Sequence, residues 1–156
     1  MGDGNDPQAV VEAMATHEET MSALYSAYAE AYPDVSDLWM KMAREEHGHS
    51  KLLRSLLDHP DDLAPFADER RFSFDQITGE TRRLRNLVQV APRAGLTMPE
   101  AFLVAKRLED TLIESHVLKP APGDPEPVAK VLGTLQEQTE RHRGHLREVL
   151  DAGSKS

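Results

Sequence analysis

Several common features are missing from this 156-residue chain, and each absence narrows the range of functions. Cysteine is absent, which excludes disulfide bonds, iron–sulfur ligation and zinc sites built on thiolates. No stretch approaches the ~20 apolar residues of a membrane span, and the first residues lack the basic and apolar regions of a signal peptide. Lys and Arg (18) are outnumbered by Asp and Glu (27), which gives a net charge of −9 and no electrostatic support for nucleic-acid binding. We therefore expect a cytoplasmic protein with neither a membrane nor a nucleic acid as its partner.

What the chain does contain is a series of amphipathic helical segments. Apolar spacing predicts four long helices, from 7 to about 32, from about 35 to 59, from 97 to about 119 and from 124 to 152, and a shorter one beginning near 73. Asp6-Pro7 predicts an N-cap followed by proline, and Thr97 with Glu100 predicts a capping box. Gly153 is expected to end the last helix. The predicted domain covers residues 7–152, with flexible ends at 1–6 and 153–156.

The lengths of the connections predict how these helices are arranged. The first and second helices are joined by a few residues around Pro33, and the third and fourth by about 120–124, so each pair should form an antiparallel hairpin. About forty residues separate the second helix from the third, which is too long for a direct turn. The expected fold is all-α, a four-helix bundle of two hairpins joined by a long crossover that contains the short helix.

Each long helix carries an ionisable residue in the middle of its apolar stripe. A single buried glutamate could still reach water, but three unpaired carboxylates would consume most of a domain's net stability of roughly 5–15 kcal/mol. No stripe offers a Lys or Arg at the same level, which leaves a bound cation as the neutraliser. Carboxylate and imidazole ligands without sulfur suit iron or manganese, with zinc as an alternative. The candidate ligands are Glu18, Glu46, His49, Glu109, His142 and His145.

Other polar residues are expected to have lesser roles or none. Tyr25 and His116 lie on the same stripes, where Tyr25 could pack or donate a hydrogen bond to a ligand, and His116 is a minor alternative ligand. The remaining charged neighbours and histidines are expected to face solvent: Glu19, Glu45, Asp110, Glu140, His17, His47 and His59.

Three stretches around these residues carry a family resemblance: Leu24-Tyr25-Ser26-Ala27-Tyr28-Ala29-Glu30, Trp39-x-x-Met42-Ala43-x-Glu45-Glu46-x-x-His49 and Ala101-x-x-x-Ala105-x-x-Leu108-Glu109. With them, residues 8–150 resemble the rubrerythrin-like branch of the ferritin-like superfamily. The resemblance implies a ferritin-like four-helix bundle holding two irons, bound by one Glu from each of the first and third helices and a Glu-x-x-His from each of the other two. Glu18, Glu46, His49 and Glu109 match that pattern position by position.

The fourth long helix departs from the family pattern. If His145 matches the family histidine, His142 stands where Glu is expected; if His142 matches it, Thr139 does. Either alignment leaves three carboxylates for two divalent cations, so one metal or a zinc ion is an alternative to two irons. The chain also lacks the Cys-x-x-Cys module through which full rubrerythrins receive electrons.

Three functions are therefore considered. The resemblance implies an oxidoreductase that acts on peroxide or dioxygen with an unidentified electron donor, or a ferroxidase. The altered fourth helix favours instead a non-catalytic metal-binding or degenerate protein with a storage, sensing or structural role. A third reading is an adaptor that binds a partner through its surface. Rubrerythrin-like domains commonly pair, so a homodimer is expected.

Overall fold

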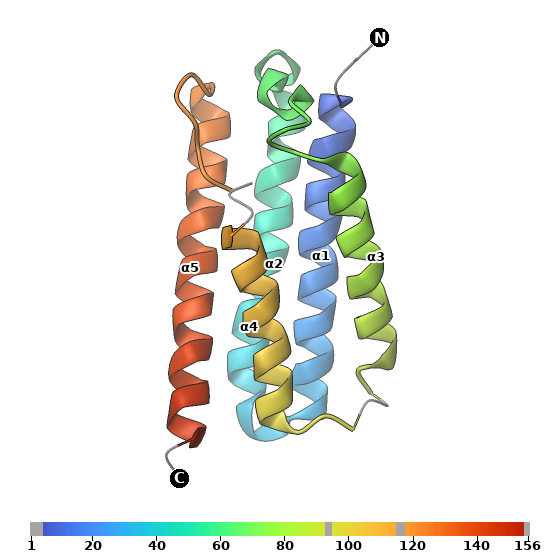
Figure 1. Cartoon of the computed structure of the whole chain (residues 1–156), viewed down its shortest axis with the longest axis vertical. Coiled ribbons are helices and arrows are strands. Elements are labelled where there is room, and N and C mark those ends of the chain that lie inside the picture. The colour runs from blue at the N-terminus through green and yellow to red at the C-terminus, as the bar shows by residue number, and fades with distance from the viewer. Residues whose placement is uncertain (1–4, 93–94, 115–117, 155–156) are drawn as a thin grey trace.

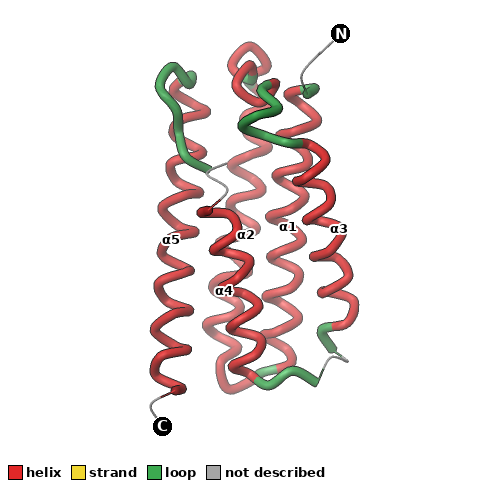
Figure 2. The backbone as a smooth tube through the Cα atoms, viewed as in Figure 1, coloured by secondary structure: helices red, strands yellow, loops and turns green. Residues whose placement is uncertain are grey.

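The computed structural model describes residues 5–92, 95–114 and 118–154, and within this part the chain is helical with no strand, which confirms the all-α prediction (Figures 1 and 2). The long helices are α1 (Pro7–Ala31), α2 (Ser36–Ser55), α3 (Phe74–Val90), α4 (Met98–Glu114) and α5 (Glu126–Ser154). Short 3-10 turns cover Pro33–Val35, Leu56–Asp58, Pro60–Asp62 and Ala64–Ala67. None of the described helices is both long and apolar enough to cross a membrane.

The predicted caps explain where several helices begin. The Asp6 side chain accepts a hydrogen bond from the backbone N–H of Gln8 at the start of α1. Ser73 caps α3 in the same way through the N–H of Gln76. Thr97 and Glu100 exchange two hydrogen bonds of 3.0 and 3.3 Å before α4, which confirms the capping box.

Three local expectations need correction. The helix in the crossover is not short: α3 has 17 residues, as many as α4, and it packs along α1. Gly153 does not end the last helix, because α5 continues to Ser154. Asn5, placed in a flexible end, is anchored by its backbone N–H, which donates to Ala67 O at 3.2 Å. The other predicted flexible residues, 1–4, 155 and 156, lie outside the described residues.

The helices run side by side, and the long crossover returns the chain to the opposite end of the molecule (Figure 1). α1 and α2 form one antiparallel pair and α4 and α5 form another, while α3 lies on the outer side of α1. Arg71 fixes the crossover to the start of α5, since its guanidinium donates two hydrogen bonds, of 2.7 and 2.8 Å, to the carboxylate of Asp124.

Two apolar clusters fill the interior, one toward each end of the helices. The first includes Val11, Phe66, Phe72 and Leu132. The second is aromatic: Trp39 stacks on Phe102 at a centroid distance of 4.7 Å. Tyr25 and Tyr28 of α1 also contact Trp39, and Tyr32, just after α1, contacts Tyr28. The level between the two clusters is polar.

Candidate metal centre

A layer of buried ionisable side chains separates the two apolar clusters, and four helices contribute to it. On α1, Glu18 lies between the apolar positions Met14 and Met21, and the other helices repeat this change from apolar to polar and back. Side chains three or four residues apart share one face of a helix, so residues at one level on four helices meet. The members are Glu18, Glu46, His49, Glu109 and His142, and none of them is more than 5% exposed.

Glu46 stands at the centre of this layer and contacts both histidines. Its Oε2 lies 3.2 Å from Nδ1 of His49, and its Oε1 lies 3.1 Å from Nδ1 of His142. The two imidazole rings are roughly parallel, with centroids 6.2 Å apart. One carboxylate therefore connects two halves of the layer, with one oxygen directed at each half.

Each half adds a second carboxylate. In one half, Glu18 Oε2 lies 3.8 Å from Nδ1 of His49. In the other, Glu109 Oε1 lies 3.4 Å from Nδ1 of His142. Ligand atoms from Glu18, Glu46 and His49 lie within 4.8 Å of one another, as do those from Glu46, Glu109 and His142. We call these two groups the Glu18 half and the Glu109 half.

The outer edges of the two imidazoles are also occupied. Nε2 of His142 lies 2.6 Å from Glu45 Oε2, and Nε2 of His49 contacts Gln138 Oε1. Because both nitrogens of each ring face oxygen acceptors, a ring must carry two protons to donate to both. Tyr25 donates its hydroxyl proton to Glu109 Oε1 at 2.8 Å, so Glu109 has a further hydrogen-bond donor.

These contacts shift the protonation of the histidines. Burial opposes charge on His49, yet hydrogen bonds and charges from Glu18 and Glu46 raise its pKa to about 11. Burial likewise opposes charge on His142, but Glu109 and Glu46 raise its pKa to about 10. The metal-free layer thus holds protonated imidazoles at neutral pH. Protonated imidazoles are therefore a second way, beside the bound cation expected from the sequence, to offset the charge of the carboxylates.

The pKa values of Glu18 and Glu46 shift in opposite directions. Burial, with the charge of Glu46 as the next cause, raises the pKa of Glu18 to about 7. Burial and the charge of Glu109 act to raise the pKa of Glu46, but hydrogen bonds from Glu18 and the two imidazoles lower it below its usual value. Glu46 is therefore the anion around which the metal-free layer is organised.

The donor set and its unused atoms fit a bound cation. In the metal-free layer, two carboxylate oxygens, Glu18 Oε2 and Glu109 Oε2, are buried without a hydrogen-bond partner. An unsatisfied buried acceptor costs about 1–3 kcal/mol. One of the two oxygens belongs to each half, so each half offers an imidazole nitrogen, an oxygen of the shared carboxylate and an oxygen without another partner.

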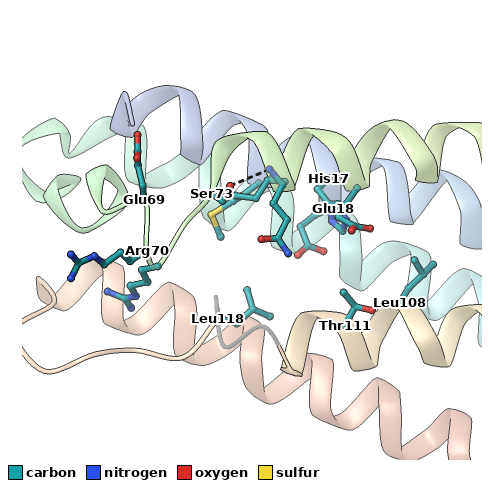
Figure 3. Close-up of a pocket in the computed structure, with 13 residues that line it drawn as sticks. His17, Glu18, Glu69, Arg70, Ser73, Leu108, Thr111 and Leu118 are labelled. Carbon is teal, nitrogen blue, oxygen red and sulfur yellow. Dashed lines mark hydrogen bonds between the residues drawn. The ribbon is translucent and has the colours of Figure 1, made fainter. Parts of the chain in front are cut away.

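A pocket of about 190 Å³ reaches the layer from the side of α1, α3 and α4 (Figure 3). Glu18 and its neighbour His17 line it, opposite Thr111 of α4. His17 was expected to face solvent, but it is half-buried, because α3 covers that side of α1. Burial lowers the pKa of His17, against the raising effect of Glu18 and Glu80. The pocket gives small solutes a route to the Glu18 half.

The structure brings together five of the six candidate ligands and places the sixth elsewhere. His145 is exposed and belongs to neither half of the layer, so its assignment as a candidate ligand is corrected. His142 occupies the layer instead, and Thr139, one turn before it, is buried at the position where the pattern on α2 has Glu46. His116 lies outside the described residues.

Sequence reasoning missed two residues at the layer's edge. Glu45 was assigned to solvent and is only 23% exposed, because His142 of α5 approaches it. Gln138 was given no role, and its amide oxygen contacts Nε2 of His49. The sequence signal that could have identified Glu45 was the pair Glu45-Glu46 in the middle of an otherwise apolar stripe. No comparable signal identified the second.

The geometry of the layer is the main guide to function in this chain. A scan against models of protein families, a search of curated proteins and a search of solved structures found no match to the sequence or the fold.

Proposed function

We propose that the polar layer binds two divalent metal ions, iron in the first instance, and that the protein is an oxidoreductase acting on peroxide or dioxygen, or a ferroxidase. The observation that carries this proposal is the position of Glu46, with one carboxylate oxygen directed at each of two histidines. A carboxylate held in this way can bridge two cations. An internal ion pair would need only one of these contacts.

The residues divide between two metal positions that share a ligand. Glu18 and His49 would hold one ion, Glu109 and His142 the other, and Glu46 both. Oxygen and nitrogen donors without sulfur suit iron and manganese, and zinc competes for the same set. Bound iron would supply one-electron redox changes and open coordination positions for a small oxidant.

The surrounding residues support such a role in specific ways. Tyr25 holds Glu109 by a hydrogen bond and fixes the direction of its free oxygen. Apolar clusters border the layer on both sides, and the pocket reaches it beside Glu18. Cations would displace the protons on His49 and His142, so metal affinity should rise with pH.

The arrangement of the helices supports the ferritin-like part of the proposal. Two antiparallel pairs joined by a crossover as long as the molecule, with a carboxylate and histidine layer contributed by four helices, is how ferritin-like di-metal proteins are built. Since the chain has no cysteine, electrons would come from a separate donor. Pairing of two chains as a homodimer is part of this proposal.

A second function is favoured by one observation, the threonine at position 139. With three carboxylates and two protonated imidazoles, the layer offsets all but one of its negative charges without metal. In that case the protein would be a non-catalytic metal-binding or degenerate relative, in which the layer sets the alignment of the helices.

Metal analysis distinguishes these functions. The protein would be purified without added metal, then loaded anaerobically with Fe²⁺ and desalted. Two irons per chain, with near-ultraviolet absorption that reductant bleaches and peroxide restores, would support the oxidoreductase. One zinc that peroxide leaves unchanged would support the second function.

Two variants make the test specific to the layer. Glu46→Gln should abolish binding at one position and weaken it at the other, because each position requires an oxygen of Glu46 and glutamine offers one, without charge. Glu19→Gln is the matched control, since Glu19 is adjacent to Glu18 but pairs with Arg54 on the surface. If the wild-type protein binds neither Fe²⁺, Mn²⁺ nor Zn²⁺, the metal-centre proposal is wrong.

A further inference from the structure

The charge of the proposed centre does not balance within its ligands. Two divalent cations carry four positive charges, and Glu18, Glu46 and Glu109 supply three negative ones. The helix that should supply a fourth carboxylate has Thr139 at that position, 1% exposed. A buried excess charge is costly, so a nearby carboxylate that is not itself a ligand becomes relevant.

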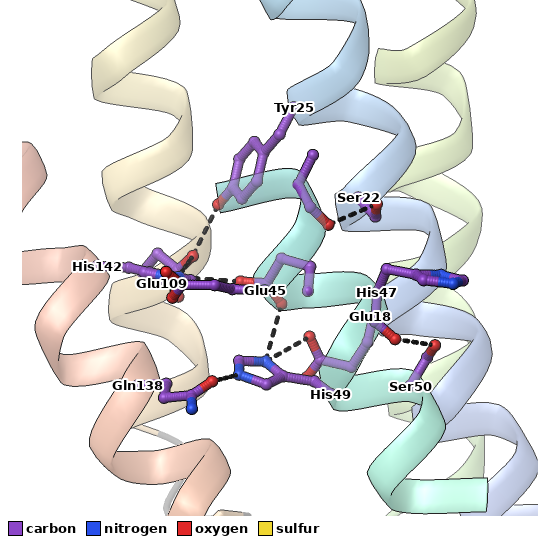
Figure 4. Close-up of polar contacts among 12 residues, drawn as sticks. Glu18, Ser22, Tyr25, Glu45, His47, His49, Ser50, Glu109, Gln138 and His142 are labelled. Carbon is purple, nitrogen blue, oxygen red and sulfur yellow. Dashed lines mark hydrogen bonds and ion pairs between the residues drawn. The ribbon is translucent and has the colours of Figure 1, made fainter. Parts of the chain in front are cut away.

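Glu45 is such a carboxylate. It precedes Glu46 on α2, but its side chain turns toward α5 and places Oε2 2.6 Å from Nε2 of His142 (Figure 4). Glu45 and His142 are 97 residues apart in the sequence. Their contact leaves Nδ1 of the His142 ring directed at Glu46 and Glu109. A carboxylate that accepts the second N–H of a ligating histidine fixes the ring and makes its free nitrogen a stronger donor.

The other half of the layer has a neutral group in the same place. Nε2 of His49 contacts the amide oxygen of Gln138, which accepts a hydrogen bond but carries no charge. The two metal positions therefore have the same ligand types and differ in the group behind the histidine.

We propose that Glu45, acting through His142, supplies the negative charge that α5 lacks and makes the Glu109 half the tighter of the two metal positions. This inference rests on the proposed metal centre and assigns Glu45 as a positioning residue for it. The Glu18 half is then the weaker, exchangeable position.

Access to the two halves agrees with this order. Glu18 lines the pocket, so an ion in its half can reach solvent through it. Glu109 is fully buried, does not line the pocket and is held by the hydroxyl of Tyr25. The half backed by a carboxylate is also the one further from the pocket.

Anaerobic titration with Co²⁺ tests the inference without depending on turnover. Co²⁺ absorption in the visible range would be followed together with calorimetry, in the wild-type protein and in Glu45→Gln, which keeps the size and the hydrogen-bond acceptor but removes the charge. The wild type should bind Co²⁺ in two steps. Glu45→Gln should weaken the tighter step by about 10–100-fold and leave the weaker step within a few-fold.

Four further variants test the assignment of the steps. Glu109→Gln should remove the tighter step and Glu18→Gln the weaker one. Gln138→Glu, which adds behind His49 the charge that Glu45→Gln removes behind His142, should strengthen the weaker step. Glu45→Asp, which keeps the charge, should retain more of the tighter step than Glu45→Gln, and circular dichroism would establish that each variant is folded.

The outcomes separate this inference from the proposed function. If the wild type binds no Co²⁺, the metal centre itself is wrong. If it binds two Co²⁺ and Glu45→Gln leaves the tighter step unchanged or weakens both steps equally, the metal centre stands and the role of Glu45 is wrong. An unchanged tighter step in Glu109→Gln would also overturn the assignment of the halves.

Discussion

Replacing Glu46 by glutamine should destabilise the metal-free protein more than any other change of one atom in the polar layer. The carboxylate has two oxygens and accepts from an imidazole with each of them, at 3.2 and 3.1 Å. The amide of glutamine has one oxygen acceptor, and its NH₂ group would face the donor of the second imidazole. One buried imidazole therefore loses its partner, and both lose the negative charge.

The magnitude follows from the contacts. Hydrogen bonds to charged groups contribute about 1.5–3 kcal/mol each, so the two contacts together amount to roughly 3–6 kcal/mol. Removing one partner of a buried ion pair costs about 3–5 kcal/mol, which agrees. Against a net stability of roughly 5–15 kcal/mol, a loss of about 4 kcal/mol is a large fraction.

Urea denaturation at pH 7 in the presence of a chelator measures this loss. With a slope of about 2 kcal/mol per molar urea, the midpoint should fall by about 2 M. Glu19→Gln, one residue from Glu18 but on the surface, should lose less than about 1 kcal/mol. Equal and small losses in the two variants would refute the account of the layer as an organised ion-pair network.

Three other predictions concern the same layer. In metal-free protein, the pKa values of His49 and His142 are raised, so these residues stabilise the fold fully below pH 6.5 and lose that effect as the pH rises through about 10–11. The free energy of unfolding, measured by urea titration, should therefore fall between pH 7 and 9. Tyr25→Phe removes a hydrogen bond to a buried carboxylate and should cost about 1–3 kcal/mol by the same assay, whereas Tyr28→Phe should cost less. Thr139→Glu adds a buried carboxylate, so it should lower the thermal midpoint without metal and increase the upward shift caused by Mn²⁺ or Fe²⁺; an unchanged shift would contradict the charge argument.

The sequence predicted the helices well because their ends carry local signals. Asp6, Thr97 and Glu100 act through contacts with residues two or three positions away, which any chain with that pattern can make. The end of α2 was placed too late: the helix stops at Ser55, and 3-10 turns continue to Asp62 around the buried Leu56. Burial of that leucine is a tertiary effect, which apolar spacing alone does not distinguish from continued helix.

The residues of the candidate site also fall into those that the sequence predicted and those that depend on how the helices pack. Glu18, Glu46 and Glu109 were found at one level because steps of three and four residues are fixed by the helix itself. The rotation of α5 was not predicted, because the sequence allowed either His142 or His145 to match the family histidine. The structure buries Leu135, Thr139, His142 and Leu146, which turns His145 outward. The contacts of Glu45 with His142 and of His17 with the pocket depend on how helices pack, which no single helix encodes.

The chain's one tryptophan provides an optical reporter on the polar layer. Trp39 is fully buried, and its ring lies 5.6 Å from Tyr25, whose hydroxyl binds Glu109. Its fluorescence comes from a single, water-free environment one side chain away from the layer. Occupancy of the layer by a paramagnetic ion would quench that emission, so metal loading could be followed in dilute unlabelled protein.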